Sequence, residues 1–235
     1  MAKFIVFGNQ KGGIGKTTLT VLVANGLSQP PFNKKVLLID NDNQKSAIRL
    51  REYDEKNYEK NQPPYLIRAM SYEQIVASIS DIDEMYDYVF IDTPGKLDAN
   101  LPPEAQQVTK ILLLTDYLFM PFKAGALNLD ATTDYVKVLL QAQRHRNFTK
   151  RPLIIFGVVN FYKERSRINR ELKDELVYLT KNVGLSFMET PLKQYISYEY
   201  LNTYESMYNP KSNDLADKNF FIFLNEFFKK INNND

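Results

Sequence analysis

The sequence predicts an α/β fold with a mostly parallel, doubly wound sheet and helices on both faces. Short apolar runs alternate along the chain with segments of helical periodicity, which is the pattern of strand–helix units in a parallel sheet. A glycine-rich loop follows the first run, and later runs end in aspartate. A length of 235 residues suits one large domain, residues 1–235, better than two small ones.

The composition excludes several classes of protein. Hydrophobic residues make up 44% of the chain and charged residues 25%, as expected for a soluble domain with a sizeable core. A net charge of +2 means that any affinity for nucleic acid has to come from a local patch. The absence of cysteine excludes disulfides and thiolate metal sites, and it fits a cytoplasmic protein. We expect no signal peptide and no membrane span, because the chain enters its first strand at once and lacks a long apolar run.

The strongest motif follows the first predicted strand, Phe4–Phe7, and precedes a predicted helix, Leu19–Leu27. Between them lies the sequence GNQKGGIGKTT, from Gly8 to Thr18. A strand, a glycine-rich loop with a lysine and hydroxyls, and a helix form the layout of a phosphate-binding loop. The general pattern is GxxxxGK[S/T], and here Gln10 occupies the position of the first glycine.

The residue types in this loop suit a nucleotide phosphate group. Glycines permit positive φ and bring backbone N–H groups close to phosphate oxygens, and the helix N-terminus attracts the anion. In such a loop Lys16 binds the β- and γ-phosphates and the Thr17 hydroxyl ligates Mg²⁺. A glycine-rich turn without a ligand is the alternative. The predicted nucleotide-binding residues of the loop are Gly12, Gly13, Ile14, Gly15, Lys16, Thr17 and Thr18.

Two later apolar runs each end in an aspartate. The run 35–40 predicts a buried strand that ends in Asp40 and is followed by Asp42, and the run 86–92 predicts another that ends in Asp92. Ligands of open α/β sheets bind at the carboxyl ends of the strands. An aspartate placed like Asp92 reaches Mg²⁺ in phosphate-binding proteins. For Asp40 alone, a helix cap or turn is an equally good interpretation.

Weaker patterns predict the remaining elements. Ser71 and Gln74 form the signature of a capping box that opens a helix through about Ser80. The segment 51–64 is polar and predicts a helix end followed by an exposed connection. The other predicted elements are strands at 65–70, 117–121 and 152–160 and helices at 102–114, 128–143 and from Arg165 onward.

The sequence KGGxGKTT after a strand resembles the deviant Walker A motif of the ParA/MinD family of P-loop ATPases, and Asn9-Gln10 before it is closer to ParA-type members. The sequence LLIDNDNQ resembles the D-x-D-P-Q motif of that family, with Asn43 in place of the proline. The resemblance covers most of the chain. Its specific motifs lie in residues 8–18, 37–44 and 88–94.

The resemblance implies roles for individual residues. In the family the signature lysine reaches across an ATP-sandwich homodimer, so Lys11 would act in trans and Lys16 in cis. By position, Asp42 would orient the water that attacks the γ-phosphate. The Mg²⁺ ligands and supporting residues implied by the resemblance are Thr17, Asp40 and Asp92. Asn160 and Pro191 would lie on the two sides of the adenine, although a strand-end turn residue explains Asn160 equally well.

The implied function is slow, Mg²⁺-dependent ATP hydrolysis that drives partition of a plasmid, a chromosome region or another cargo. A ParB-like adaptor would stimulate hydrolysis, and the ATP-bound dimer would bind DNA non-specifically and associate with the nucleoid. The alternatives are a MinD-like ATPase that cycles on a membrane, a related small-molecule synthetase, and a nucleotide-dependent regulatory module with little hydrolysis. The candidate DNA contacts are Arg144, Arg146, Lys150, Arg151, Lys163, Arg165, Arg167, Arg170 and Lys193.

The C-terminal segment 219–231 bears on the membrane alternative. Its apolar residues surround much of the predicted helix, and only Lys229 and Lys230 supply positive charge. A helix at a membrane surface has a cleaner basic face. We therefore expect a buried terminal helix that closes the core.

Overall fold

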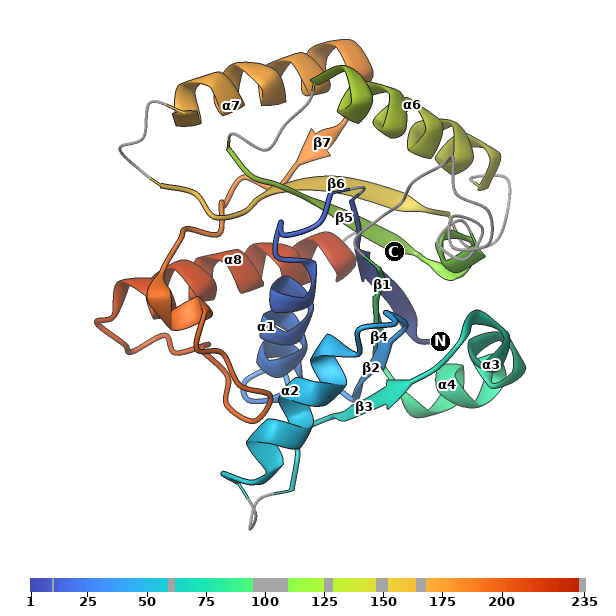
Figure 1. The fold of residues 1–235 in the computed structure, drawn as a ribbon, viewed down its shortest axis with the longest axis vertical. Helices are drawn as coiled ribbons and strands as arrows, with labels where there is room; N and C mark the ends of the chain where they lie inside the picture. Colours follow the sequence, from blue (N-terminus) through green and yellow to red (C-terminus); the bar gives the residue numbers. More distant parts are fainter. Residues whose placement is uncertain are drawn as a thin grey trace.

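A seven-stranded parallel sheet forms the centre of the molecule (Figure 1). The structure is a computed structural model that describes residues 1–9, 11–58, 62–94, 110–124, 129–146, 152–163 and 168–232. The strand order is β3-β2-β4-β1-β5-β6-β7, and each pair of neighbours is parallel. The strands are β1 (Lys3–Phe7), β2 (Val36–Asp40), β3 (Leu66–Ala69), β4 (Tyr88–Asp92), β5 (Tyr117–Phe122), β6 (Ile154–Val159) and β7 (Ser186–Phe187).

Helices cover both faces of this sheet, which confirms the predicted fold class. One face packs against α1 (Lys16–Ser28), α2 (Ser46–Glu55) and α8 (Leu215–Asn232). The other face packs against α3 (Tyr72–Ala77), α4 (Ile79–Met85), α6 (Leu129–Arg146) and α7 (Ile168–Tyr178). Two short helical turns also occur, a π-helix at Leu179–Val183 and a 3₁₀ turn at Ile196–Tyr198.

The central strands are buried on both faces, which explains why their sequences are continuous apolar runs. Every residue of β2, β4 and β5 is buried. On the α1 and α8 face, the rings of Phe7, Phe119 and Phe227 pack together, with 4.5 Å between the ring centroids of Phe119 and Phe227. This aromatic cluster fixes α8 against the middle of the sheet.

The C-terminal helix closes the core, as predicted. Its apolar side chains Phe220, Phe223, Phe227 and Ile231 are fully buried, so the face that a membrane-surface helix would need is already covered. Among the described residues, no helix is long and apolar enough to cross a bilayer.

Several elements differ from the prediction in their bounds. The capping box of Ser71 and Gln74 is present, but Ser78 leaves helical geometry (φ −108°, ψ 9°) and divides the expected helix into α3 and α4. The first helix begins at Lys16, because Gly15 has a left-handed conformation and acts as its N-cap. Most of the helix expected at 102–114 lies outside the described residues, and 110–114 are helical. The sequence did not predict β7, which has only two residues.

Candidate functional site

The glycine-rich loop lies at the carboxyl edge in the middle of the sheet. It leaves β1, which pairs with β4 on one side and β5 on the other, and it ends where α1 begins. Gly13 (φ 70°) and Gly15 (φ 85°) both have a left-handed backbone conformation, which glycine adopts without strain. The loop therefore stands where ligands bind in open α/β sheets.

The back of this loop packs against the end of β6. The Asn160 amide donates a hydrogen bond to the Ile14 carbonyl (2.8 Å), and its oxygen accepts one from the Phe161 N–H (3.0 Å). A Cβ atom at Gly15 would lie 2.5 Å from the Asn160 amide nitrogen and 2.9 Å from the Phe161 ring. The predicted base contact Asn160 thus supports the loop through one buried hydrogen bond, as expected for a strand-end residue. A contact with the base stays a prediction.

Lys16 bends back across the loop. Its ammonium group donates a hydrogen bond to the Lys11 carbonyl (3.1 Å), and the side chain is buried. Burial lowers the pKa of Lys16, while the carboxylates of Asp92 and Asp42 oppose that effect. The Lys11 N–H donates to the Asn9 side chain, so both predicted lysines belong to one hydrogen-bonded loop.

Thr17 and Asp92 come together as a metal site requires. The Thr17 hydroxyl donates to one Asp92 carboxylate oxygen (2.7 Å). The other Asp92 oxygen and the Thr93 hydroxyl are buried, and neither has a hydrogen-bond partner among the described residues. The pKa of Asp92 is raised to about 7, mainly by burial; the Asp40 and Asp42 carboxylates contribute to the rise, whereas the hydrogen bond from Thr17 and the charge of Lys16 oppose it.

Mg²⁺ fits these groups. Carboxylate and hydroxyl oxygens are the ligands that Mg²⁺ prefers, and it usually takes only one or two protein carboxylates together with substrate phosphates. Among the residues that the structure describes, no group of three or more His, Cys, Asp or Glu side chains could hold a metal ion by itself. A bound cation would therefore depend on Thr17, Asp92 and a phosphate ligand together.

Asp40 and Asp42 follow β2, next to β4. The Asp40 carboxylate accepts hydrogen bonds from the N–H groups of Asp42 (3.2 Å), Ala47 (3.0 Å) and Ile48 (3.1 Å). Burial raises the pKa of Asp40, and these N–H groups oppose the rise. The carboxylate thus fixes the start of α2, which agrees with the helix-cap interpretation. Its role at the metal stays a prediction, as does the role of the half-buried Asp42.

Pro191 lies in a loop beside the end of β6. The Leu192 N–H donates to the Val159 carbonyl (2.8 Å), and the Tyr162 N–H donates to the Leu192 carbonyl (3.1 Å). Pro191 and Val159 also line a cavity of about 430 Å³. The structure therefore places Asn160 and Pro191 at the same strand end, while their contact with a base stays untested.

The candidate DNA contacts are only partly described. Arg144 is exposed on α6, Lys193 pairs with Tyr162 in a parallel bridge, and Lys163 follows Tyr162. Four candidates lie outside the described residues, namely Lys150, Arg151, Arg165 and Arg167, and only the backbone is described for Arg146 and Arg170. No basic DNA-binding patch can be assigned from these positions.

Sequence reasoning missed residues whose role depends on distant partners. Thr93 gives no local signal beyond its place after Asp92, although its buried hydroxyl has no hydrogen-bond partner among the described residues. Asn219 and Glu226 on α8 form hydrogen bonds with the backbone of the loop that contains Pro191. A helix of mixed apolar and polar residues gives no indication of such contacts.

Comparisons with known proteins agree with this geometry. The model of the CobQ/CobB/MinD/ParA nucleotide binding domain matches residues 5–193. The chain is 21% identical over 190 residues to the maintenance of carboxysome distribution protein A of Halothiobacillus neapolitanus, covering 81% of this chain and 79% of that protein.

Two solved structures illustrate the likeness in fold. A protein described as a plasmid partition protein of Borrelia burgdorferi B31, bound to AMPPNP, has a TM-score of 0.66 and 24% identity and covers 97% of this chain and 99% of its own. The cobyrinic acid a,c-diamide synthase of Mycobacterium smegmatis, with a bound ATP analog and magnesium, has a TM-score of 0.68 and 14% identity and covers 100% of this chain and 97% of its own.

The parallel sheet and the loop between β1 and α1 define a P-loop nucleotide-binding protein. Since the family model spans most of the chain, the chain belongs to the CobQ/CobB/MinD/ParA nucleotide-binding domain family. The resemblance to the ParA/MinD family is thereby confirmed.

Proposed function

We propose that this chain is a ParA-type ATPase that binds ATP with Mg²⁺ and hydrolyses it slowly to ADP and phosphate. The observation that carries the proposal is the hydrogen bond from Thr17 to Asp92 beside the buried Lys16. In P-loop ATPases this hydroxyl and carboxylate hold Mg²⁺ and the lysine binds the β- and γ-phosphates. When bound, Mg²⁺ supplies positive charge that stabilises the γ-phosphate during transfer.

The other loop residues bind and orient the nucleotide. The backbone N–H groups from Gly12 to Thr18 face the phosphates at the start of α1. Asp42 orients the attacking water, and Asp40 supports the Mg²⁺ shell while its carboxylate fixes the start of α2. The Asp42 N–H donates a hydrogen bond to the Asp40 carboxylate. This bond fixes the position of Asp42, which orients the water, relative to Asp40, which supports the Mg²⁺ shell.

Substitutions in this set give the test of the proposal. Lys16→Ala should abolish tight ATP binding, because it removes the charge that faces the phosphates. Asp42→Ala should retain binding, lose turnover and trap the ATP-bound dimer. Asp81→Ala, which removes an exposed carboxylate of α4, is the matched control. Equal ATP affinity in Lys16→Ala, or unchanged turnover in Asp42→Ala, would overturn the site assignment.

We also propose that ATP closes a homodimer in which Lys11 contacts the phosphates bound by the partner. Lys11 lies at the start of the loop, and its carbonyl accepts the hydrogen bond from Lys16. Sedimentation with ATP and Mg²⁺ tests this proposal. Lys11→Ala should bind ATP and remain a monomer, whereas a normal ATP-dependent dimer of this variant would refute a role in trans.

The cellular role that we propose is partition or positioning of a cargo in the cytoplasm, with a ParB-like adaptor that stimulates hydrolysis. Support comes from the relatives, which are described as a carboxysome distribution protein and a plasmid partition protein. Non-specific DNA binding belongs to this proposal and would place the protein on the nucleoid. It should require ATP and weaken steeply as salt rises. Equal DNA retention with ATP, with ADP and without nucleotide would refute an ATP-controlled DNA track.

A further inference from the structure

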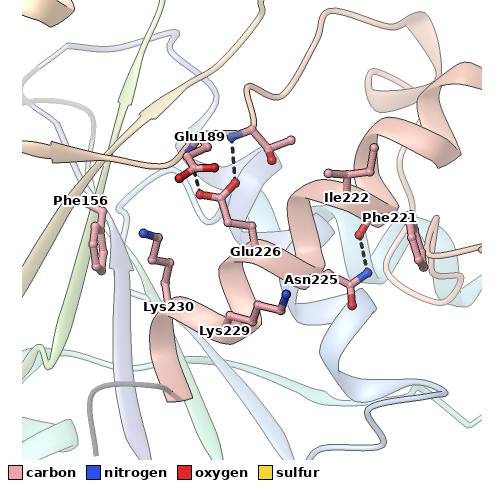
Figure 2. A pocket seen from close by; sticks show the side chains of 9 residues that line it. Phe156, Glu189, Phe221, Ile222, Asn225, Glu226, Lys229 and Lys230 are labelled. Atoms are coloured by element: carbon pink, nitrogen blue, oxygen red, sulfur yellow. Dashed lines mark hydrogen bonds between the residues drawn. The ribbon is translucent and has the colours of Figure 1, made fainter.

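The Glu226 carboxylate of α8 holds the loop Met188–Lys193 from one side. Its two oxygens accept hydrogen bonds from the N–H groups of Glu189 (2.6 Å) and Thr190 (2.8 Å), as Figure 2 shows. Hydrogen bonds to a charged acceptor are stronger than neutral ones. One side chain of α8 thus determines the position of two successive peptide groups in the loop.

Asn219 holds the same loop further along. It lies seven residues before Glu226 on the same face of α8 and is buried. Its oxygen accepts the Lys193 N–H (2.8 Å), and its amide donates to the Pro191 carbonyl (2.9 Å). The Tyr198 hydroxyl also reaches the Asn219 oxygen (3.3 Å). Asn219 is therefore hydrogen-bonded to the loop backbone on both sides of Leu192.

The backbone N–H groups of this loop donate hydrogen bonds partly to β6 and partly to α8. The N–H groups of Met188 and Leu192 donate to the Gly157 and Val159 carbonyls of β6. Those at positions 189, 190 and 193 donate to α8 side chains, and a proline at 191 has no N–H. The β6 carbonyls and the α8 side chains thus hold the loop together, and the α8 bonds lie at its more exposed side.

The same connection continues to the phosphate loop. Tyr162 follows β6 and bonds Leu192, while Asn160, two residues earlier, bonds the Ile14 carbonyl. The loop at 188–193 and the phosphate loop are therefore fixed to the same end of one strand. In the proposed function, the base of a nucleotide bound at the phosphate loop lies at this strand end.

We propose that Asn219 and Glu226 are positioning residues that set the affinity of the site for the base of the nucleotide, by holding the Pro191 loop against β6. This inference rests on the proposed function, in which Pro191 lies beside the adenine. Neither side chain needs to touch the nucleotide.

Loss of the α8 support has a defined structural consequence. A groove of about 780 Å³ lies between β6 and α8, lined by Phe156, Glu189, Glu226 and Lys230 among others (Figure 2). Without the Glu226 carboxylate, the freed N–H groups turn toward water in this groove, because an unpaired donor is costly. The loop then moves away from β6 and the wall beside the base is lost, while the phosphate loop keeps its own hydrogen bonds.

The experiment compares ATP with inorganic tripolyphosphate, which has the phosphates but no base, by calorimetric titration in Mg²⁺. The variants are Glu226→Ala, Asn219→Ala and Glu226→Gln, since a glutamine accepts only one of the two N–H groups. Lys229→Ala is the matched control, because Lys229 is exposed and lines the same groove. Hydrogen exchange of residues 188–193 reports the loop directly. Should the buried Asn219 variant fail to fold, the two Glu226 variants decide alone.

We expect ATP affinity to fall roughly tenfold in Glu226→Ala, which corresponds to about 1.4 kcal/mol, with a smaller loss in Glu226→Gln. Tripolyphosphate affinity should change less than about twofold on the same scale, and Lys229→Ala should match the parent protein. Faster loop exchange with unchanged ATP affinity, or an equal loss for both ligands, overturns the inference. A parent protein that binds ATP no better than tripolyphosphate overturns both this inference and the proposed base contact, while phosphate binding would stand.

Discussion

Asp92→Asn should stabilise the nucleotide-free and metal-free protein at neutral pH while removing its Mg²⁺-dependent function. The Asp92 carboxyl is fully buried, and burial raises its pKa from 3.8 to about 7. An asparagine at this position still accepts the hydrogen bond from Thr17 but carries no charge. The same buried charge that would hold the metal is thus unfavourable when no cation is present.

The magnitude follows from proton linkage. Between pH 3.8 and about 7 the unfolded chain has lost the Asp92 proton and the folded protein has kept it. The native state then binds more protons, so stability falls as pH rises through this range and levels off above about pH 7. Since each pKa unit corresponds to about 1.4 kcal/mol, the full cost of the ionised carboxylate is about 4 kcal/mol.

Urea unfolding with EDTA measures this cost. The gain in stability of Asp92→Asn over the parent protein should grow by about 2–3 kcal/mol between pH 5 and pH 8. Other groups titrate alike in the two proteins, so their contributions largely cancel in the difference between the two free energies of unfolding. Asp174→Asn, which changes an exposed carboxylate of α7, is the control and should show no such growth. A gain that is equal at both pH values, or a variant that is less stable at pH 8, would refute the reasoning.

Two further predictions concern stability without nucleotide. Gly15→Ala should lower the free energy of unfolding by at least about 2 kcal/mol, since φ is 85° and the new Cβ would lie 2.5 Å from the Asn160 amide nitrogen. A Cβ atom at Gly12 would have no other atom within 4 Å, so Gly12→Ala should lower Tm much less. An equal effect of the two substitutions on Tm would contradict this explanation. Arg51→Ala removes a buried guanidinium that donates three hydrogen bonds, and urea unfolding should show a loss of about 3 kcal/mol. The exposed Arg49 of the same helix is its control, and a similar loss in Arg49→Ala would show that the buried bonds are not the cause.

Much of the fold could be predicted because its signals are local. The runs that became β2 and β4 are apolar throughout, since both of their faces are buried. The phosphate loop is recognisable from residues 8–18 alone, because its glycines, Lys16 and Thr17 are close together in the sequence. The division at Ser78 was missed, since serine is tolerated within a helix and only packing determines that the chain turns there.

Roles that depend on distant contacts could not be predicted. No pattern around Asn160 shows that it bonds Ile14, because the two residues are 146 positions apart. Asp40 remained open between a metal role and a helix cap, since both place a carboxylate after a strand; its bonds to Ala47 and Ile48 show the capping contact. Asn219 and Glu226 belong to a helix whose pattern predicts burial of its apolar face and nothing about its polar contacts.

Calorimetric titration of ATP into the parent protein and into Lys16→Ala, each with Mg²⁺ and with EDTA, tests most directly whether the loop between β1 and α1 is a Mg²⁺–nucleotide site. We expect the parent protein to bind ATP more tightly in Mg²⁺ than in EDTA, because Thr17 and Asp92 would hold the cation together with the phosphates. Lys16→Ala should bind at least roughly 100-fold more weakly, or about 2.7 kcal/mol, while a cooperative unfolding transition shows that the variant is folded. Equal dissociation constants for the two proteins, with no effect of Mg²⁺ on either, would contradict the assignment of this loop as the nucleotide site.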